Sequence, residues 1–219
     1  MPRLLFSKKG NAVWISHLDL MRLFQRAFKR AGLPLTHTQG FNPRPSVSIA
    51  LPLSVGVESS CELLDFDLEG DPVSNEEIQE RLNRVLVEGI RVLQVYCDTA
   101  KLKHLAFLDC IVSLEYDKGV PSGAVDQIKA LFEQETVLVE KRSKNGVQDQ
   151  NIIPMIQRMD VLRSGENLIE LRARICCQNP TLNPGQLSAA ISRYLPEYAP
   201  DYSKCSRIEI YDTNEMIFR

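Results

Sequence analysis

The 219-residue sequence contains no apolar run close to the ~18 residues that a helix needs to cross a bilayer. Its first residues, MPRLLFSKKGNAVW, lack the apolar stretch of a secretory signal. Hydrophobic residues make up 44% of the chain and charged residues 25%, which is enough apolar material for a core and unlike a disordered chain. We therefore expect a cytoplasmic protein without membrane contact that folds along its whole length.

The sequence also lacks the short motifs of common cofactor sites. It has no P-loop, no GxGxxG, and no CxxxCxxC of the kind that holds an iron–sulfur cluster. Neither a CxxC pair nor a regular spacing occurs among the cysteines, which are Cys61, Cys97, Cys110, Cys176, Cys177 and Cys205. We therefore expect buried, reduced thiols, no metal site and no cofactor.

Positive charge is concentrated at one end of the chain. Residues 1–60 hold eight Lys or Arg against only Asp19 and Glu58, whereas the remainder holds 18 basic against 26 acidic residues. A localised positive field is typical of proteins with an anionic partner, such as RNA or an acidic protein surface. The pI near 6.0 argues against a general nucleic-acid coat protein.

The hydrophobic pattern predicts the order β-α-β-β-α-β in each half of the chain. The first half has strands at 3–6, 46–51, 62–70 and 90–97, with helices at 16–32 and 74–86. The second half has strands at 108–116, 137–141, 167–177 and 206–211, helices at 122–134 and from Asn183, a charged turn at 144–150 and an ambiguous segment at 151–162.

Corresponding elements of the two halves lie roughly 105 to 116 residues apart. This repeat predicts an α+β fold of two tandem ferredoxin-like (split βαβ) domains with antiparallel sheets, a basic domain at 1–100 and an acidic domain at 101–219. A single large α+β sheet needs the same elements and is the alternative.

The helix expected from residue 16 has both ends marked. Ser16 and Asp19 form a capping-box pattern, Ser74 and Glu77 repeat it at the second helix, and Gly32 ends the first helix. Two faces are predicted inside the first helix. The apolar face holds Leu18, Met21, Phe24, Phe28 and Ala31, and the basic face holds Arg22, Arg26 and Arg30 with Lys29 beside them.

The segment GFNPRP at 40–45 raises a separate question, since two prolines stiffen a polar stretch. Gly40 can supply a turn, while Pro43 and Pro45 hold the residues before them, Asn42 and Arg44, extended. We expect a stiff arm that presents Gln39, Asn42 and Arg44. The alternative is a plain connection from a helix to an edge strand.

His17 stands at the start of the basic helix. Together with Lys8, Lys9 and Arg44 it could bind a phosphate, or it could act as a general base. The alternative is a histidine that hydrogen-bonds locally at a helix start. No serine, cysteine or second histidine is placed in the sequence to complete a nucleophilic site with His17, and His37 and His104 are isolated.

The stretch SHLDLMRLFQRAFKRAGLPLTHTQGFNPRPSVSIALPLSVGVES resembles the radical-SAM-linked protein family, a domain of unknown function found beside or fused to radical SAM proteins that often carry a cobalamin-binding-type domain. The matching positions are His17, Asp19, Arg22, Gly40, Phe41, Asn42, Pro43, Arg44, Gly56 and Glu58. The resemblance implies an accessory subunit whose partner performs any radical chemistry. Some members are joined to ribonuclease-type proteins, which favours RNA as the substrate, while the resemblance itself carries over no activity.

Three hypotheses follow for the function. The leading one is a non-catalytic companion of a radical SAM enzyme that binds or presents RNA. The second is a metal-free endoribonuclease using His17, and the third is a protein-docking module without nucleic-acid contact. The predicted binding residues are Lys8, Lys9, His17, Arg22, Arg26, Arg30, Gln39, Asn42 and Arg44, and the residues predicted to shape the surface are Asp19, Gly40, Phe41, Pro43, Pro45, Gly56 and Glu58.

Overall fold

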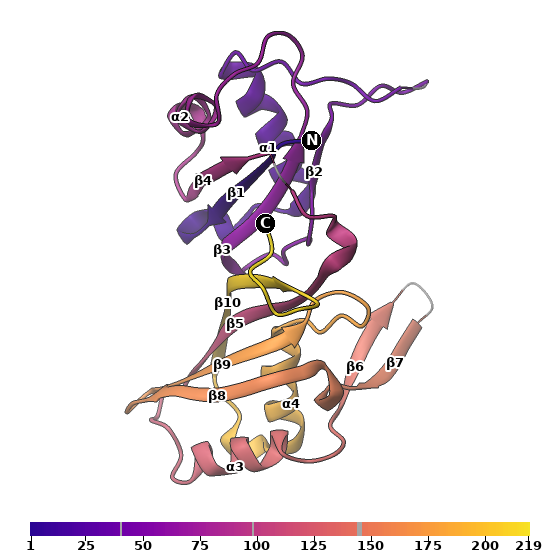
Figure 1. Ribbon diagram of the computed structural model, residues 1–219. Helices are drawn as coiled ribbons and strands as arrows, with labels where there is room; N and C mark the ends of the chain where they lie inside the picture. The colour runs from indigo at the N-terminus through magenta and orange to yellow at the C-terminus, as the bar shows by residue number, and fades with distance from the viewer. Residues whose placement is uncertain (40, 98, 144–145) are drawn as a thin grey trace. The chain divides into compact units, whose positions relative to one another are not determined.

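The computed structural model describes residues 1–39, 41–97, 99–143 and 146–219. It is a mixed α/β structure with four α-helices in the described residues, and the strand pairs within each unit are antiparallel (Figure 1). The chain divides into two compact units, residues 1–104 with Arg219, and residues 105–218. No helix in the described part of the chain is long and apolar enough to cross a membrane.

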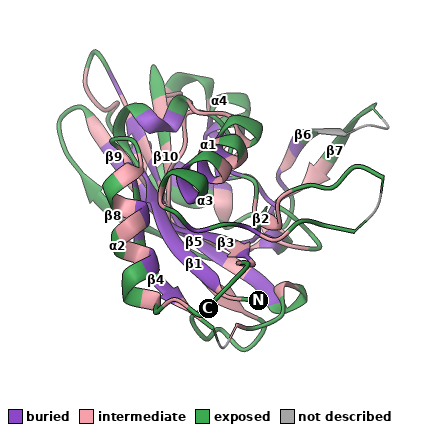
Figure 2. Ribbon diagram, turned by 90° about the horizontal axis from the view of Figure 1, so that it is seen from above, coloured by how far each residue is buried: buried purple, intermediate pink, exposed green. Residues whose placement is uncertain are grey.

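Unit 1 consists of a four-stranded sheet and two helices. Its elements are β1 (Arg3–Lys8), the 3-10 turn η1 (Gly10–Trp14), α1 (His17–Arg30), β2 (Val47–Ile49), β3 (Glu58–Phe66), α2 (Asn75–Val85) and β4 (Ile90–Tyr96). The strands lie in the order β4-β1-β3-β2. In Figure 2 the central strands β1 and β3 are buried, whereas the outer sides of the helices are exposed.

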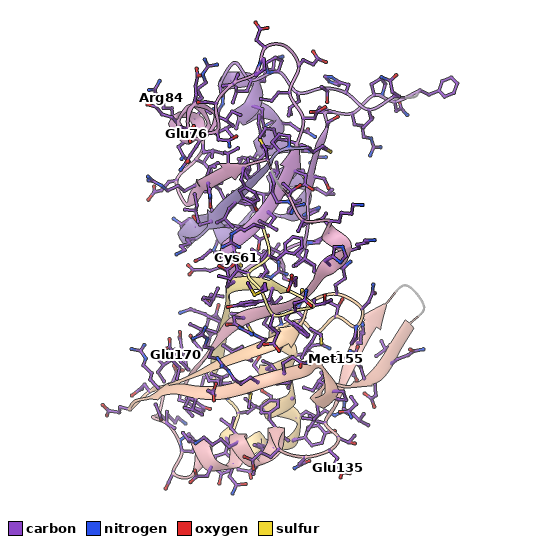
Figure 3. The ribbon with its side chains drawn as sticks, viewed as in Figure 1. Cys61, Glu76, Arg84, Glu135, Met155 and Glu170 are labelled. Atoms are coloured by element: carbon purple, nitrogen blue, oxygen red, sulfur yellow. The ribbon has the colours of Figure 1, made fainter. Side chains whose placement is uncertain are left out.

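Both helices pack on this sheet through one hydrophobic core. The rings of Phe6 in β1 and Phe24 in α1 meet edge to face with centroids 4.8 Å apart, and those of Phe28 and Phe66 are 5.0 Å apart. Ile78 and Leu82 of α2 enter the same core. Glu76 and Arg84 lie on the outer side of α2 (Figure 3).

Unit 2 has the same succession of elements with an added hairpin. Its elements are β5 (Leu105–Glu115), α3 (Ala124–Phe132), β6 (Leu138–Ser143), β7 (Gly146–Asn151), β8 (Ile156–Ser164), β9 (Leu168–Cys176), α4 (Gly185–Tyr194) and β10 (Tyr202–Asp212). The main strands lie in the order β10-β5-β9-β8, and β6 pairs only with β7. In β9, Ile169, Leu171, Ala173 and Ile175 are buried at every second position, so one face of this sheet carries the core.

The predicted turn at 144–150 is wrong over part of its length. Residues 146–150 belong to β7, whose partner strand β6 includes the predicted strand residues 138–141, and Lys144 and Asn145 lie outside the described residues. The ambiguous segment resolves into the turn Ile153–Met155 and strand β8. Polar strands of this kind carry no apolar alternation, which is why the pattern failed there.

Helix α1 begins as its cap predicts, because the Ser16 hydroxyl accepts the Asp19 backbone N–H at 3.2 Å. It ends at Arg30, and Gly32 follows the capping Ala31 with a φ of +67° that suits glycine. The predicted apolar face is wrong at Leu18, which is 66% exposed. Leu20 occupies the core instead, in the helical series Leu20, Phe24, Ala27 and Phe28.

The cysteines are mostly buried, as expected. Cys61, Cys110, Cys176 and Cys177 are buried and Cys205 is half-buried. The expectation fails for Cys97, which is exposed just after the end of β4.

Candidate nucleic-acid interface

The outer face of α1 carries a row of cations. Arg22, Arg26 and Arg30 follow one another at intervals of four residues, which places them roughly 6 Å apart along the helix axis. With Lys29 they border an open depression of about 760 Å³, which we call the basic groove. Its other lining residues are Ile15, Asp19, Leu23 and Val87.

Two of these cations are held in place and two are available. Arg22 donates to the Asp19 carboxylate at 3.0 Å, and Arg30 donates to the Val85 carbonyl oxygen. In the part of the chain that the structure describes, the side chains of Arg26 and Lys29 have no hydrogen-bond partner, and both residues are exposed. The groove therefore combines fixed positive charge with side chains that can move to a ligand.

Asp19 is the acidic residue that lines this groove. Hydrogen bonds from the Ser16 hydroxyl and from Arg22 hold the pKa of its carboxyl below the ordinary value. The carboxylate therefore stays ionised at neutral pH and anchors Arg22 at the start of the row.

The two helices of unit 1 differ in charge although both have exposed arginines. On α2, Arg81 and Arg84 pair with Glu77 and Glu80 one turn away, so these charges cancel locally. On α1 only Asp19 opposes the cationic row.

The prediction of a basic domain at 1–100 needs correction. Counted over these residues, 11 basic side chains face 12 acidic ones. Arg3, moreover, is 2% exposed and paired with Asp65 inside the fold. The positive field belongs to the outer face of α1 and its surroundings, not to the unit as a whole.

Lys8 was predicted to bind an anion, and the structure contradicts this. Its side chain is 1% exposed, and its ammonium group donates to the carbonyl oxygens of Val13 at 3.0 Å and Ile15 at 2.9 Å. All six residues of β1 are buried between β3 and β4, so the charge at Lys8 needs internal acceptors. Lys9 is exposed and remains a candidate.

The predicted arm is a two-limbed projection rather than a single straight segment. Thr38 N–H donates to the Arg44 carbonyl oxygen at 2.8 Å, Arg44 N–H donates to the Thr38 hydroxyl at 3.0 Å, and Ser46 N–H donates to the Thr36 carbonyl oxygen at 2.8 Å. Between α1 and β2 this segment extends away from the rest of unit 1 (Figure 1).

The end of the projection is polar, with one apolar exception. Gln39, Asn42, Pro43 and Arg44 are exposed, and Phe41 is fully exposed. Gly40, which was predicted to supply the turn, lies outside the described residues. The prediction that Gln39, Asn42 and Arg44 are presented to solvent agrees with their exposure, while their role in binding stays a prediction.

A second depression connects the base of the projection with α1. It measures about 430 Å³ and includes Lys29 and Gln25 of α1, His37 and Pro45 of the projection, and Glu69. Lys29 lines both this depression and the basic groove. The projection and the arginine row therefore border neighbouring surfaces of unit 1.

His17 is half-buried at the first position of α1. Its Nδ1 atom is buried, and it has no hydrogen-bond partner in the part of the chain that the structure describes. His17 does not line either depression, and Lys8 is committed elsewhere, so the predicted cluster of Lys8, Lys9, His17 and Arg44 does not form around the Lys8 ammonium.

The remaining motif residues shape the loops beside α1. Glu58 accepts the Gly10 backbone N–H at 3.2 Å, and Gly56 N–H donates to the Val13 carbonyl oxygen at 3.0 Å. Gly56 has φ +83°. These contacts hold η1 against the loop that leads into β3.

Sequence reasoning missed Trp14, the last residue of η1. Its side chain is 65% exposed, and it directly precedes Ile15, which lines the basic groove. The available signal was its position, since this tryptophan, the only one in the chain, stands two residues before the capping Ser16.

Comparison with known families now identifies the chain. The family model described as "Uncharacterized protein conserved in bacteria (DUF2344)" matches residues 2–184. The chain belongs to this family. A search of curated proteins found no match.

Solved structures show where the fold of this DUF2344 protein recurs. A chain of the "Crystal Structure of a Cbf5-Nop10-Gar1 Complex" is similar with a TM-score of 0.53 and 9% identity, over 95% of this chain and 48% of the other. A chain of the "Crystal structure of the archaeal box H/ACA sRNP Nop10-Cbf5 complex" is similar with a TM-score of 0.47 and 8% identity, over 94% of this chain and 46% of the other. This chain thus spans about half the length of these structures, and the first likeness shows a shared fold.

Proposed function

We propose that this protein binds RNA without catalysing a reaction on it, through the basic groove of α1. The observation that supports this most directly is the row of Arg22, Arg26 and Arg30 with Lys29 around one open depression that only Asp19 opposes. Guanidinium groups bind phosphate oxygens with two parallel hydrogen bonds, and a row of them follows a nucleic-acid backbone.

The projection at 36–46 adds a second set of contacts to this proposal. Arg44 is exposed near its end, and its backbone is fixed by the two hydrogen bonds to Thr38. A backbone that is ordered before binding loses less entropy when a ligand docks. Arg44, Asn42 and Gln39 would then contact the RNA beyond the groove.

RNA binding at this surface is tested with a fluorescently labelled cellular small-RNA pool over a salt series. We expect affinity to fall as salt rises, since phosphate contacts release counterions. Arg44→Ala should weaken binding, whereas Arg158→Ala, which removes an exposed arginine of β8 paired with Asp160, should not. Binding that ignores salt, or equal effects of both variants, would contradict the proposal.

The link to a radical SAM enzyme is a further part of the proposal, and it rests on the sequence resemblance alone. In this view the DUF2344 protein presents RNA while a separate subunit performs the chemistry. Co-purification of a radical SAM protein with the tagged full chain would support this part. If no such protein is retained, the link fails while RNA binding still stands.

We also propose that both units are ferredoxin-like domains. In unit 1 the order β4-β1-β3-β2, with helices after β1 and β3, supports this assignment. Unit 2 gives the equivalent order β10-β5-β9-β8 once the β6–β7 hairpin is treated as an insertion. An experimental structure in which β2 or β8 pairs elsewhere would overturn the assignment.

A further inference from the structure

We infer that the RNA is single-stranded where it meets α1, and that one unpaired base stacks on the indole ring of Trp14. This inference rests on the proposed function and names its substrate class. It is carried by the exposure of Trp14, by the hydrogen bonds that hold its backbone and by its position next to Ile15, which lines the basic groove.

Trp14 is exposed although the two residues before it in the turn are buried. Ala12 and Val13 are buried, while the indole of Trp14 remains 65% exposed. Large aromatic side chains on a surface are characteristic of binding sites, because their burial on binding is strongly favourable.

The backbone around Trp14 is held from both sides. The buried Lys8 ammonium donates to the carbonyl oxygens of Val13 and Ile15, which flank the tryptophan. Gly56 N–H donates to the same Val13 oxygen at 3.0 Å. A buried charge is thus used to fix a turn that displays an exposed ring.

The ring itself is supported by Gly56. A Cβ at Gly56 would lie 3.5 Å from Cζ3 and 3.9 Å from Cη2 of Trp14, so the indole ring lies beside Gly56. A Cβ at these distances would make ordinary van der Waals contact with the ring, so glycine is favoured at position 56 by its φ of +83° and not by a lack of space. A ring backed in this way is preordered for stacking.

Trp14 stands three residues before the first residue of α1, and the arginine row begins on the second turn of that helix. Leu18, 66% exposed, lies one turn before Arg22 in the same four-residue series as Arg26 and Arg30. Apolar surface therefore begins where the cationic row ends, and Ile15 belongs to the groove itself. A strand whose phosphates follow the arginines would have a base within reach of this apolar end.

This arrangement favours single strands over duplexes. Proteins that bind single-stranded nucleic acid combine a positive groove for the backbone with aromatic rings on which bases stack. In a duplex the base faces are covered by their neighbours, so the indole would have no face to contact. Stacking also tolerates any base, so we expect little sequence preference at this position.

The test uses the full chain, since its single tryptophan makes intrinsic fluorescence specific for Trp14. A dye-labelled 12-nucleotide single-stranded RNA is titrated, and dye anisotropy and Trp14 emission are recorded together. We expect Trp14 emission to change with the same midpoint as anisotropy. The duplex of the same sequence should leave the emission unchanged.

Two variants separate this inference from the proposed function. Trp14→Ala should weaken single-strand binding roughly tenfold with an unchanged salt slope, and Trp14→Phe should retain most of the affinity. The inference would be overturned if binding depends on salt but Trp14 emission does not change and Trp14→Ala binds as tightly as wild type. RNA binding by the basic groove would still stand, and the ring would then contact another partner, such as a protein segment. No binding at low salt would overturn both.

Discussion

The ammonium group of Lys8 donates a hydrogen bond to the carbonyl oxygen of Ile15 at 2.9 Å, inside the protein. Ile15 lines the basic groove, so a buried cation fixes the edge of a surface that exposed cations form. The adjacent lysines of the sequence thus have different roles, because Lys8 holds the turn and Lys9 faces solvent.

Lys8→Met should lower the free energy of unfolding by about 2–3 kcal/mol, because carbonyl oxygens in the interior lose a charged donor. Lys9→Met is the matched control and should change it by less than about 0.5 kcal/mol. Urea unfolding monitored by circular dichroism measures both. Equal effects of the two substitutions would contradict the assigned role of Lys8.

Gly89→Ala should be more damaging than Gly70→Ala. Both glycines have φ near +90°, but a Cβ at Gly89 would lie 2.3 Å from the Lys9 carbonyl oxygen, whereas a Cβ at Gly70 meets nothing within 4 Å. Gly70→Ala should lower the free energy of unfolding by about 1 kcal/mol because of backbone strain. Gly89→Ala should lower it by about 2 kcal/mol more because of the clash with the Lys9 carbonyl oxygen. Thermal unfolding of both variants measures this difference, and similar losses would show that η1 and the turn before β4 are not in close contact.

The double variant Arg26→Gln/Lys29→Gln should reduce both RNA affinity and its salt dependence. Each lost phosphate contact should lower the slope of log affinity against log salt by about 0.7 for a single strand. Arg158→Gln in β8 is the control, with an unchanged slope expected. A double variant that binds as wild type would place the RNA away from the α1 groove.

Asp109 should be the main acid-sensitive group of unit 2. It is 1% exposed and accepts hydrogen bonds from Arg174 at 2.7 Å and Arg172 at 2.9 Å. Burial alone would raise the pKa of its carboxyl, but the hydrogen bonds from Arg174 and Arg172 lower it overall. Asp109→Ala should lower the free energy of unfolding by about 3–5 kcal/mol at pH 7. Asp160→Ala, which breaks the exposed ion pair with Arg158, should lower it by less than about 1 kcal/mol.

The sign of the pH effect follows from the lowered pKa. Between the folded and unfolded pKa values of Asp109 the unfolded chain binds more protons, so stability falls as the pH drops below about 5. Urea midpoints from pH 7 to pH 3 should show this loss in wild type and a smaller one in Asp109→Asn. A steeper loss in the variant would contradict the assignment.

Thiol labelling at pH 8 should show one fast cysteine. Burial raises the pKa of Cys110 and of Cys177 to about 12 and that of Cys205 to about 11, so these thiols stay protonated and slow to react. Cys97 is exposed. Cys97→Ser should therefore remove the fast phase, and a fast phase that persists would show that a buried thiol becomes accessible.

Local signals predicted the local structure well. Ser16, Ser74 and Gly32 marked helix ends because capping depends on nearby backbone groups alone. Leu18 and Leu20 could not be separated in the same way, since both fit an apolar helix face and the sheet beneath decides which one is covered.

The candidate site was predictable only in part. The four-residue spacing of Arg22, Arg26 and Arg30 predicted their common face, since helix geometry requires it. Nothing local distinguishes Lys8 from Lys9, because burial at Lys8 results from strands β3 and β4 on either side of β1. Trp14 and Gly56 lie side by side in loops about forty residues apart in the sequence, and no periodic pattern predicts such a contact.

The central claim is that single-stranded RNA lies along α1 and that one of its bases stacks on Trp14. The most direct measurement is ultraviolet crosslinking of single-stranded RNA containing 4-thiouridine to the full chain, followed by mass spectrometry of tryptic peptides. We expect crosslinks in the peptide of residues 10–22, which contains Trp14 and Arg22, and their loss at high salt. Crosslinks confined to residues 105–218, or none at low salt, would contradict the account.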